Sequence, residues 1–193
     1  MRWRYRETVL TLCTLAFFAT MVGRLAISPV VPLITEEFAI SNSLIGLALT
    51  GMWIAYSASQ FPSGVLADRT GERLVILLAI GGTALTGFFV ALAPIFALFV
   101  VGTIALGAAA GLHYSVATTL LARTYYNLGT AIGVHNIGAP SAGLLAPPVV
   151  AWIGVRYGCR PAVGLASPVA VPIFALFAWA FRPTAPPRPE QPM

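Results

Sequence analysis

Six long apolar runs, separated by short polar or Gly- and Pro-containing segments, constrain the fold of this chain more than any other feature. A helix that crosses a hydrocarbon core of about 30 Å needs about 20 apolar residues. Charged residues make up only 9% of the 193 residues, whereas soluble domains carry roughly 25%. In lipid, every backbone N–H and C=O must be hydrogen-bonded within the protein, which favours helices for runs of this length. The sequence therefore predicts an all-α membrane protein.

The breaks between the apolar runs place the predicted transmembrane helices. The helices are expected at residues 8–34, 43–66, 74–93, 95–121, 129–152 and 161–182. The first run is too long for a signal peptide and lacks a small-residue cleavage site, so it is interpreted as the first helix. Residues 1–7 precede this bundle of residues 8–182, and residues 183–193 form a Pro-rich tail that cannot continue a helix.

The distribution of arginines predicts that both termini are cytoplasmic. If the N-terminus is inside, eight arginines are cytoplasmic, Arg24 lies within a helix, and only Arg156 and Arg160 are external. Cytoplasmic loops are enriched in Lys and Arg, and six helices return the chain to its starting side. We therefore expect a multi-pass protein of the plasma (cell) membrane, and the net charge of +5 does not indicate a nucleic-acid partner. The cytoplasmic set is Arg2, Arg4, Arg6, Arg69, Arg73, Arg123, Arg182 and Arg188.

A dense group of charges links the second and third apolar runs, in the segment Gly64-Val65-Leu66-Ala67-Asp68-Arg69-Thr70-Gly71-Glu72-Arg73. Such charge must lie at a membrane surface. The spacing of Gly64, Asp68, Arg69, Gly71 and Arg73 resembles the signature of the major facilitator superfamily between its second and third transmembrane helices. The resemblance implies the N-terminal six-helix half-bundle of that fold, built from two three-helix inverted repeats. It also implies that this motif latches the two halves of the transporter on the cytoplasmic side. Glu72 departs from the pattern, which usually has a basic residue there.

Two further segments carry weaker resemblances. Gly133, Gly138, Pro140 and Gly143 form a small-residue packing motif in the fifth helix, because small residues let membrane helices approach closely. This motif loosely resembles the Gly-Pro motif of superfamily antiporters. Gly111-Leu112-His113-Tyr114, Gly129 to His135 and Gly158-Cys159-Arg160-Pro161 resemble the fosmidomycin-resistance efflux branch. In the fourth helix, Thr103 occupies the position at which the superfamily pattern of proton-coupled drug antiporters has an arginine.

Polar residues inside the predicted helices are the candidates for a solute cavity. Polar groups in hydrocarbon cost free energy unless partners or water satisfy them. They occur in the first, second, fourth and fifth helices, which should therefore surround a common interior. The third and sixth helices are nearly purely apolar and can face lipid. The candidates are Arg24, Trp53, Tyr56, Gln60, His113, Tyr114, His135 and Asn136.

Arg24 is the most costly of these residues, and no acidic residue in the predicted helices neutralises it. It is a candidate to bind an anionic solute through its bidentate guanidinium, or else a structural group bonded to carbonyls freed near Pro29 and Pro32. His113 and His135 lie at similar depths and are candidates for a proton relay, or else hydrogen-bond a helix carbonyl. The sequence thus predicts secondary active transport or efflux of a small organic solute, with protons as a candidate coupling ion.

The expected partners are the lipid bilayer, the solute, and a second six-helix half or a second copy of this chain. A truncated fragment or membrane scaffold without transport remains the alternative. An enzyme is not expected, because Ser115 beside His113 lacks the Gly frame of an intramembrane protease and the sixth helix has no His. No cofactor, metal site or disulfide is expected, since Cys13 lies in an apolar run and Cys159 in a predicted external loop. Cys159 is therefore expected to be open to the outside.

Overall fold

The computed structural model describes residues 5–182, which contain helices and no strand. Within this part of the chain, six spans are long and apolar enough to cross a membrane, as the apolar runs predict. The elements are α1 (Tyr5–Leu25), the 3-10 helix η1 (Ser28–Val30), α2 (Val31–Glu37), α3 (Asn42–Thr70), α4 (Glu72–Leu92), α5 (Phe96–Thr124), α6 (Leu128–Asn136), α7 (Gly138–Tyr157), α8 (Cys159–Val163) and α9 (Ala166–Ala180).

Three of the six spans are broken where the sequence predicts continuous helices. The first changes from α1 to η1 and α2 after Leu25, near Pro29 and Pro32, whose rings remove backbone donors. The fifth is interrupted at Ile137, between α6 and α7, three residues before Pro140. The sixth is interrupted after Val163, between α8 and α9.

The charged link between the second and third spans is much shorter than the sequence predicts. Helix α3 continues to Thr70, so Asp68 and Arg69 lie in its last turn and not in a loop. Only Gly71 separates α3 from α4, with a φ of 87° that a residue without a Cβ adopts at little cost. The turn therefore places the motif's charges on two helix ends.

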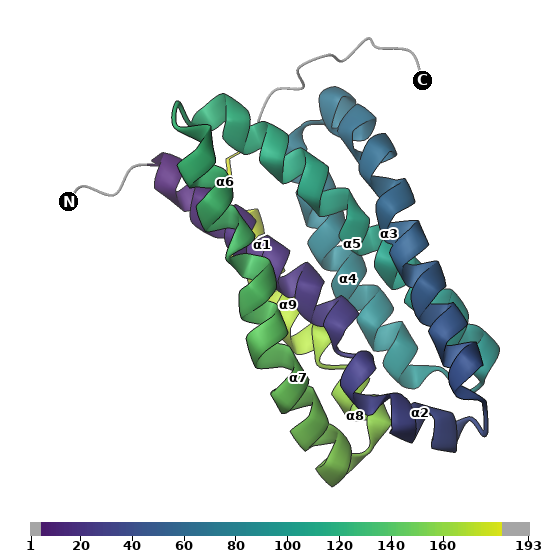
Figure 1. The fold of residues 1–193 in the computed structure, drawn as a ribbon. Coiled ribbons are helices and arrows are strands. Elements are labelled where there is room, and N and C mark those ends of the chain that lie inside the picture. The colour runs from purple at the N-terminus through teal and green to yellow at the C-terminus, as the bar shows by residue number, and fades with distance from the viewer. Residues whose placement is uncertain (1–4, 183–193) are drawn as a thin grey trace.

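Figure 1 shows α3 and α7 at the two edges of the bundle, with α1 and α5 between them. Helix α3 packs on α5, α7 packs on α1, and α4 and α9 pack behind α1 and α5. The four polar spans therefore form one broad face, and that they surround a common interior stays a prediction. Helices α4 and α9 cover only the rear of these four spans, so the front of the face is left uncovered by the described residues.

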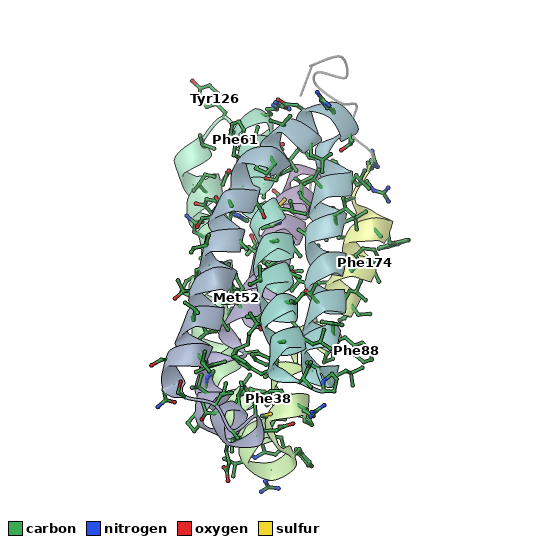
Figure 2. All side chains as sticks on the ribbon, turned by 90° about the vertical axis from the view of Figure 1, so that its right-hand side faces the viewer. Phe38, Met52, Phe61, Phe88, Tyr126 and Phe174 are labelled. Carbon is green, nitrogen blue, oxygen red and sulfur yellow. The ribbon has the colours of Figure 1, made fainter. Side chains whose placement is uncertain are left out.

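The outer surfaces of α4 and α9 are apolar, as expected of helices that face lipid. Leu85 and Phe88 on α4, and Phe174 and Trp179 on α9, are all exposed. Figure 2 shows Phe88 and Phe174 pointing away from the bundle on the same side. The inner face of α4 is nevertheless buried along much of its length, because it packs on α5 and α9.

The first and last described helices meet at one end of the bundle. The backbone N–H of Arg182 donates to the Tyr5 hydroxyl over 2.7 Å. Arg73 donates from Nη2 to the Ala178 carbonyl over 2.7 Å and from Nε to the Phe181 carbonyl over 3.0 Å, capping the end of α9. This end also carries the signature motif. Arg2, Arg4, Arg188 and the Pro-rich tail lie outside the described residues, and the membrane side of this end stays a prediction.

Two glycines of α5 allow a very close crossing of α5 and α3. A Cβ on Gly107 would overlap the Met52 carbonyl, and one on Gly111 would overlap the Tyr56 carbonyl. The spacing Gly107-x-x-x-Gly111 thus lets the backbones of α3 and α5 touch, which is a common mode of packing in membranes. The contact fixes the height and rotation of the α3 segment that carries Tyr56.

Gly107→Ala is expected to destabilise the protein by about 1–3 kcal/mol, because the added methyl group pushes α3 away from α5. Gly133→Ala is the matched control, since no atom lies within 4 Å of its added Cβ. That control is expected to be neutral or to stabilise α6 by up to about 1 kcal/mol. Thermal unfolding of both variants in detergent micelles measures the difference, and equal melting temperatures would contradict the close crossing.

Candidate functional site

Arg24 lies fully buried in the last turn of α1, with 1% of its surface exposed. Its Nε donates to the Thr20 carbonyl over 3.4 Å, and Nη2 contacts the Met21 sulfur. None of the ion pairs formed among residues 5–182 includes Arg24. The predicted partner carbonyls near Pro29 and Pro32 are not among its hydrogen-bond acceptors. The guanidinium is therefore a buried cation that contacts one backbone carbonyl, the Met21 sulfur and the Tyr56 side chain, which also hydrogen-bonds it.

Two aromatic residues of α3 cover this cation. The Arg24 Cζ atom lies 3.8 Å from the centre of the Tyr56 ring and 4.8 Å from that of Trp53. The two rings meet edge to face at 5.8 Å. A cation over an aromatic face is stabilised by the ring quadrupole, by about 2 kcal/mol where water is excluded. The rings therefore offset part of the desolvation cost of Arg24 without neutralising its charge.

Trp53 lies between this cation and the surface. Its side chain is 42% exposed, and it lines a groove of about 750 Å³ that runs along α3. The other residues of the groove are Leu49, Thr50, Ile54, Ser57 and Ala58. The groove is predominantly apolar, with two hydroxyl groups. The Trp53 indole ring thus separates Arg24 from this open groove.

His113 and His135 form a second buried cluster, on α5 and α6. Both side chains are fully buried, and their ring centres lie 5.5 Å apart. Phe17 of α1 stacks on both rings, at 5.8 Å from His113 and 5.0 Å from His135. Tyr114 lies 6.1 Å from His135. The structure therefore brings together four residues from three helices, of which Phe17 was not a sequence candidate.

The remaining two cavity candidates are less buried than Arg24 and the two histidines. Gln60 lies one turn beyond Tyr56 on α3, and Asn136 ends α6 beside His135. Both are half-buried. All eight cavity candidates therefore lie on α1, α3, α5 and α6, and the two buried groups among them are Arg24 with its aromatic rings and the histidine pair.

The signature motif forms a charge cluster between α3, α4 and α5. The Arg123 guanidinium lies 2.8 Å from a Glu72 carboxylate oxygen and 3.6 Å from an Asp68 oxygen. Glu72 is buried, whereas Asp68 is half-buried. Asp68 and Arg123 also line a cavity of about 130 Å³ with Gly64. The departure at Glu72 thus adds a second carboxylate that holds Arg123 more closely than Asp68 does.

The glycines of both motifs differ in how closely their neighbours approach. A Cβ on Gly138 would lie 2.7 Å from the Thr14 carbonyl oxygen, so this residue allows α7 to touch α1. Gly64 and Gly133 have no atom within 4 Å of such a Cβ, and Gly143 has only Leu25 at 4.0 Å. Gly64 therefore makes no close helix contact among the described residues.

A third cluster joins α2 to α8 at the opposite end of the bundle. The Cys159 thiol donates to one Glu37 carboxylate oxygen over 2.6 Å, and Arg160 Nε donates to the other over 2.6 Å. Cys159 begins α8 and is only 6% exposed. The prediction of an open loop cysteine is therefore wrong, because the carboxylate and the helix start bury the thiol.

Comparisons with known proteins identify the family of this chain. A sequence model of the Major Facilitator Superfamily matches residues 13–193. The chain belongs to this superfamily. The segment from Gly64 to Arg73 thus indicates the correct superfamily, and the finer resemblance to its fosmidomycin-resistance branch is not confirmed.

Two of the curated relatives are named as transporters of small solutes. The probable sulfoacetate transporter SauU of Cupriavidus necator is 32% identical over 189 residues, which cover 94% of this chain and 43% of the relative. The hexuronate transporter of Bacillus subtilis is 28% identical over 149 residues, covering 76% and 35%. The chain therefore spans less than half the length of these curated relatives.

Solved structures show the same fold. A bacterial homolog of the human lysosomal transporter Spinster, in an inward-facing and unoccupied conformation, aligns with a TM-score of 0.81 at 17% identity. The match covers 96% of this chain and 45% of that one. The peptide transporter POT in complex with sulfate aligns with a TM-score of 0.80 at 17% identity, covering 95% and 41%. The predicted six-helix half-bundle of the facilitator fold is confirmed.

Proposed function

We propose that this chain forms one half of a secondary transporter that moves a small organic anion across the plasma membrane. The observation that carries the proposal is Arg24, a buried guanidinium with no carboxylate partner among residues 5–182. A charge inside a membrane protein is costly and marks a solute or ion pathway by default. The names of the relatives, which include sulfoacetate, hexuronate and anion transporters, support a small anion as the solute.

The geometry around Arg24 suits a transient anionic partner. A built-in carboxylate would neutralise the guanidinium and compete with a solute, whereas Trp53 and Tyr56 contact the guanidinium without neutralising it. The N–H groups lie in the plane of the guanidinium. Nε and Nη2 already contact Thr20 and Met21, so a carboxylate or sulfonate would bind through the remaining N–H groups. An arriving anion has to displace the Trp53 ring, which is the exposed member of the pair.

The second half of the transporter is part of this proposal. In this fold the solute site lies between two halves, and transport is the rocking of one half against the other. The broad face of α1, α3, α5, α6 and α7 is the wall that such a half would cover. We propose that Asp68, weakly held at 3.6 Å by Arg123, contributes to a latch between the halves on the cytoplasmic side. Both termini are proposed to lie on that side.

Addition of sulfoacetate is expected to change the tryptophan fluorescence of the purified chain in a saturable manner, because the anion displaces Trp53 from Arg24. This chain supplies one wall of the site, including Arg24, so weak binding at millimolar concentration, or about −4 kcal/mol, is expected. Trp53→Phe should remove the change, and Trp152→Phe and Trp179→Phe should keep it. An equal concentration of chloride controls for ionic strength. The same response in Trp53→Phe, or no response at all, would count against the proposed function.

A further inference from the structure

Met21 contacts the guanidinium of Arg24 and has no role in the proposed anion site. It lies three residues before Arg24 on α1, so the two side chains share one face of the helix. The Nη2 group of Arg24 contacts the Met21 sulfur. A thioether sulfur is only a weak hydrogen-bond acceptor, so this contact leaves most of the charge uncompensated. Oxidation of the sulfur would convert it into a polar group at the same place.

Met21 and Met52 differ in how open they are to a small reagent. Met21 is half-buried and packs against a small apolar cluster of Val22, Ala142 and Ala146. Met52 of α3 is 1% exposed, and its backbone carbonyl lies in the close crossing of α3 and α5. A sulfur that a water-soluble oxidant can reach is oxidised before one that is packed on all sides. Met21 is therefore expected to be oxidised before Met52.

We propose that Met21 is an oxidation site, and that its sulfoxide lowers the affinity of Arg24 for an anion. This inference rests on the proposed function of Arg24. The sulfoxide oxygen is attached to the atom that Nη2 already contacts, and it is a strong acceptor in place of a weak one. Oxidation therefore gives the guanidinium a built-in partner, which an arriving carboxylate or sulfonate has to displace.

The oxidant is a hydroperoxide, of which hydrogen peroxide is the simplest. A lone pair of the Met21 sulfur attacks one peroxide oxygen, and the O–O bond breaks. The released hydroxide takes the proton from the transferred oxygen and leaves as water. The sulfur is oxidised by two electrons, and the peroxide is reduced by the same two. Arg24 is placed to donate an N–H to the departing oxygen, on which negative charge develops during the step.

The other contacts of the guanidinium explain why one new acceptor matters. Nε donates to the Thr20 carbonyl, and the Tyr56 side chain hydrogen-bonds the group as well. An anion depends on the N–H groups that these contacts leave free, and Nη2 is shared with Met21. Losing one charge-assisted hydrogen bond lowers an affinity about tenfold. Oxidation of Met21 is expected to weaken anion binding by about this factor.

Peroxide treatment of the purified chain in detergent tests the inference. The chain is incubated with hydrogen peroxide, the excess is removed with catalase, and peptide mass spectrometry follows each of the four methionines. Met21 is expected to gain one oxygen several-fold faster than Met52. Isothermal titration with sulfoacetate should then show binding about tenfold weaker than that of the untreated chain. Equal oxidation rates of Met21 and Met52 would contradict the proposed site.

Two variants of Met21 serve as controls. Met21→Leu has a similar volume but no sulfur, and it keeps the other methionines and both cysteines. Peroxide should leave its sulfoacetate affinity unchanged. Met21→Gln carries an amide oxygen close to the position of the sulfoxide oxygen. It should therefore bind sulfoacetate about tenfold more weakly without any peroxide, and peroxide should cause no further loss.

The outcomes separate this inference from the proposed function. Sulfoacetate binding that is equally strong before and after complete oxidation of Met21 would overturn the oxidation site and leave the anion site standing. Absence of binding to the untreated chain would remove the anion site, and this inference with it. A peroxide-dependent loss that persists in Met21→Leu would assign the effect to another residue. If that variant does not fold, the time course in the unaltered chain decides, because affinity must fall in step with oxidation of Met21.

Discussion

Arg24→Gln is expected to lower the affinity of the chain for sulfoacetate about a hundredfold. Two charge-assisted hydrogen bonds from one guanidinium contribute about 3 kcal/mol, and each 1.4 kcal/mol is a factor of ten. Arg24→Lys keeps the charge but loses the planar fork, so a loss of about tenfold is expected. Isothermal titration of the purified chain with sulfoacetate measures both variants.

The stability of these variants separates a solute role from a structural role. Because Arg24 is buried without a carboxylate partner, its neutral replacement removes a desolvation cost, and Arg24→Gln is expected to melt at the same temperature as the unaltered chain or higher. A structural cation that held α1 to α3 would show the opposite, a lower melting temperature. Unchanged sulfoacetate affinity in Arg24→Gln would refute the assignment of the anion site.

The chain by itself is expected to support no sulfoacetate flux into liposomes above the protein-free background. One half supplies one wall of a pathway that needs two, and alternating access requires movement between the walls. The polar face is then left open and should be covered by a complementary half or by a second copy. Cysteines introduced at exposed positions of the helices that form that face, such as Ile54 on α3 or Leu144 on α7, should therefore form cross-linked complexes.

Cysteines on the lipid-facing side are the matched control for this experiment. Leu85 on α4 and Val171 on α9 are exposed to similar degrees, and their helices lie behind the polar face. They should yield little cross-linking at the same protein density. Flux carried by a chain that remains monomeric would be incompatible with a half-transporter.

The native cysteines do not provide a clean test of membrane topology. The Cys159 thiol is buried and hydrogen-bonded to Glu37, and Cys13 is buried in the middle of α1. Neither thiol is therefore a surface probe. A cysteine introduced at Tyr126, which Figure 2 shows projecting at the end near Phe61, is better suited to report which side of the membrane that end faces.

The sequence by itself determined the number of spans, the helical class and the superfamily. The first two follow from local composition, because an apolar run of about 20 residues in lipid has few structural choices. The superfamily follows from the short motif between Gly64 and Arg73, whose spacing can be recognised without knowing which helices contact one another. The sequence also identified Arg24 as unusual, since the cost of a charge in hydrocarbon does not depend on its neighbours.

The tertiary structure decided which residues meet. Tyr56 lies over Arg24 because Gly111 lets α5 touch the α3 backbone at Tyr56, and no pattern within α3 alone contains this fact. Membrane helices are apolar on all sides, so periodicity gives only a weak indication of which face is inside. The same holds for Phe17, an ordinary apolar residue in the sequence that the packing of α1 places against two histidines. Contacts between helices far apart in the chain depend on interhelical shape, which only the assembled bundle specifies.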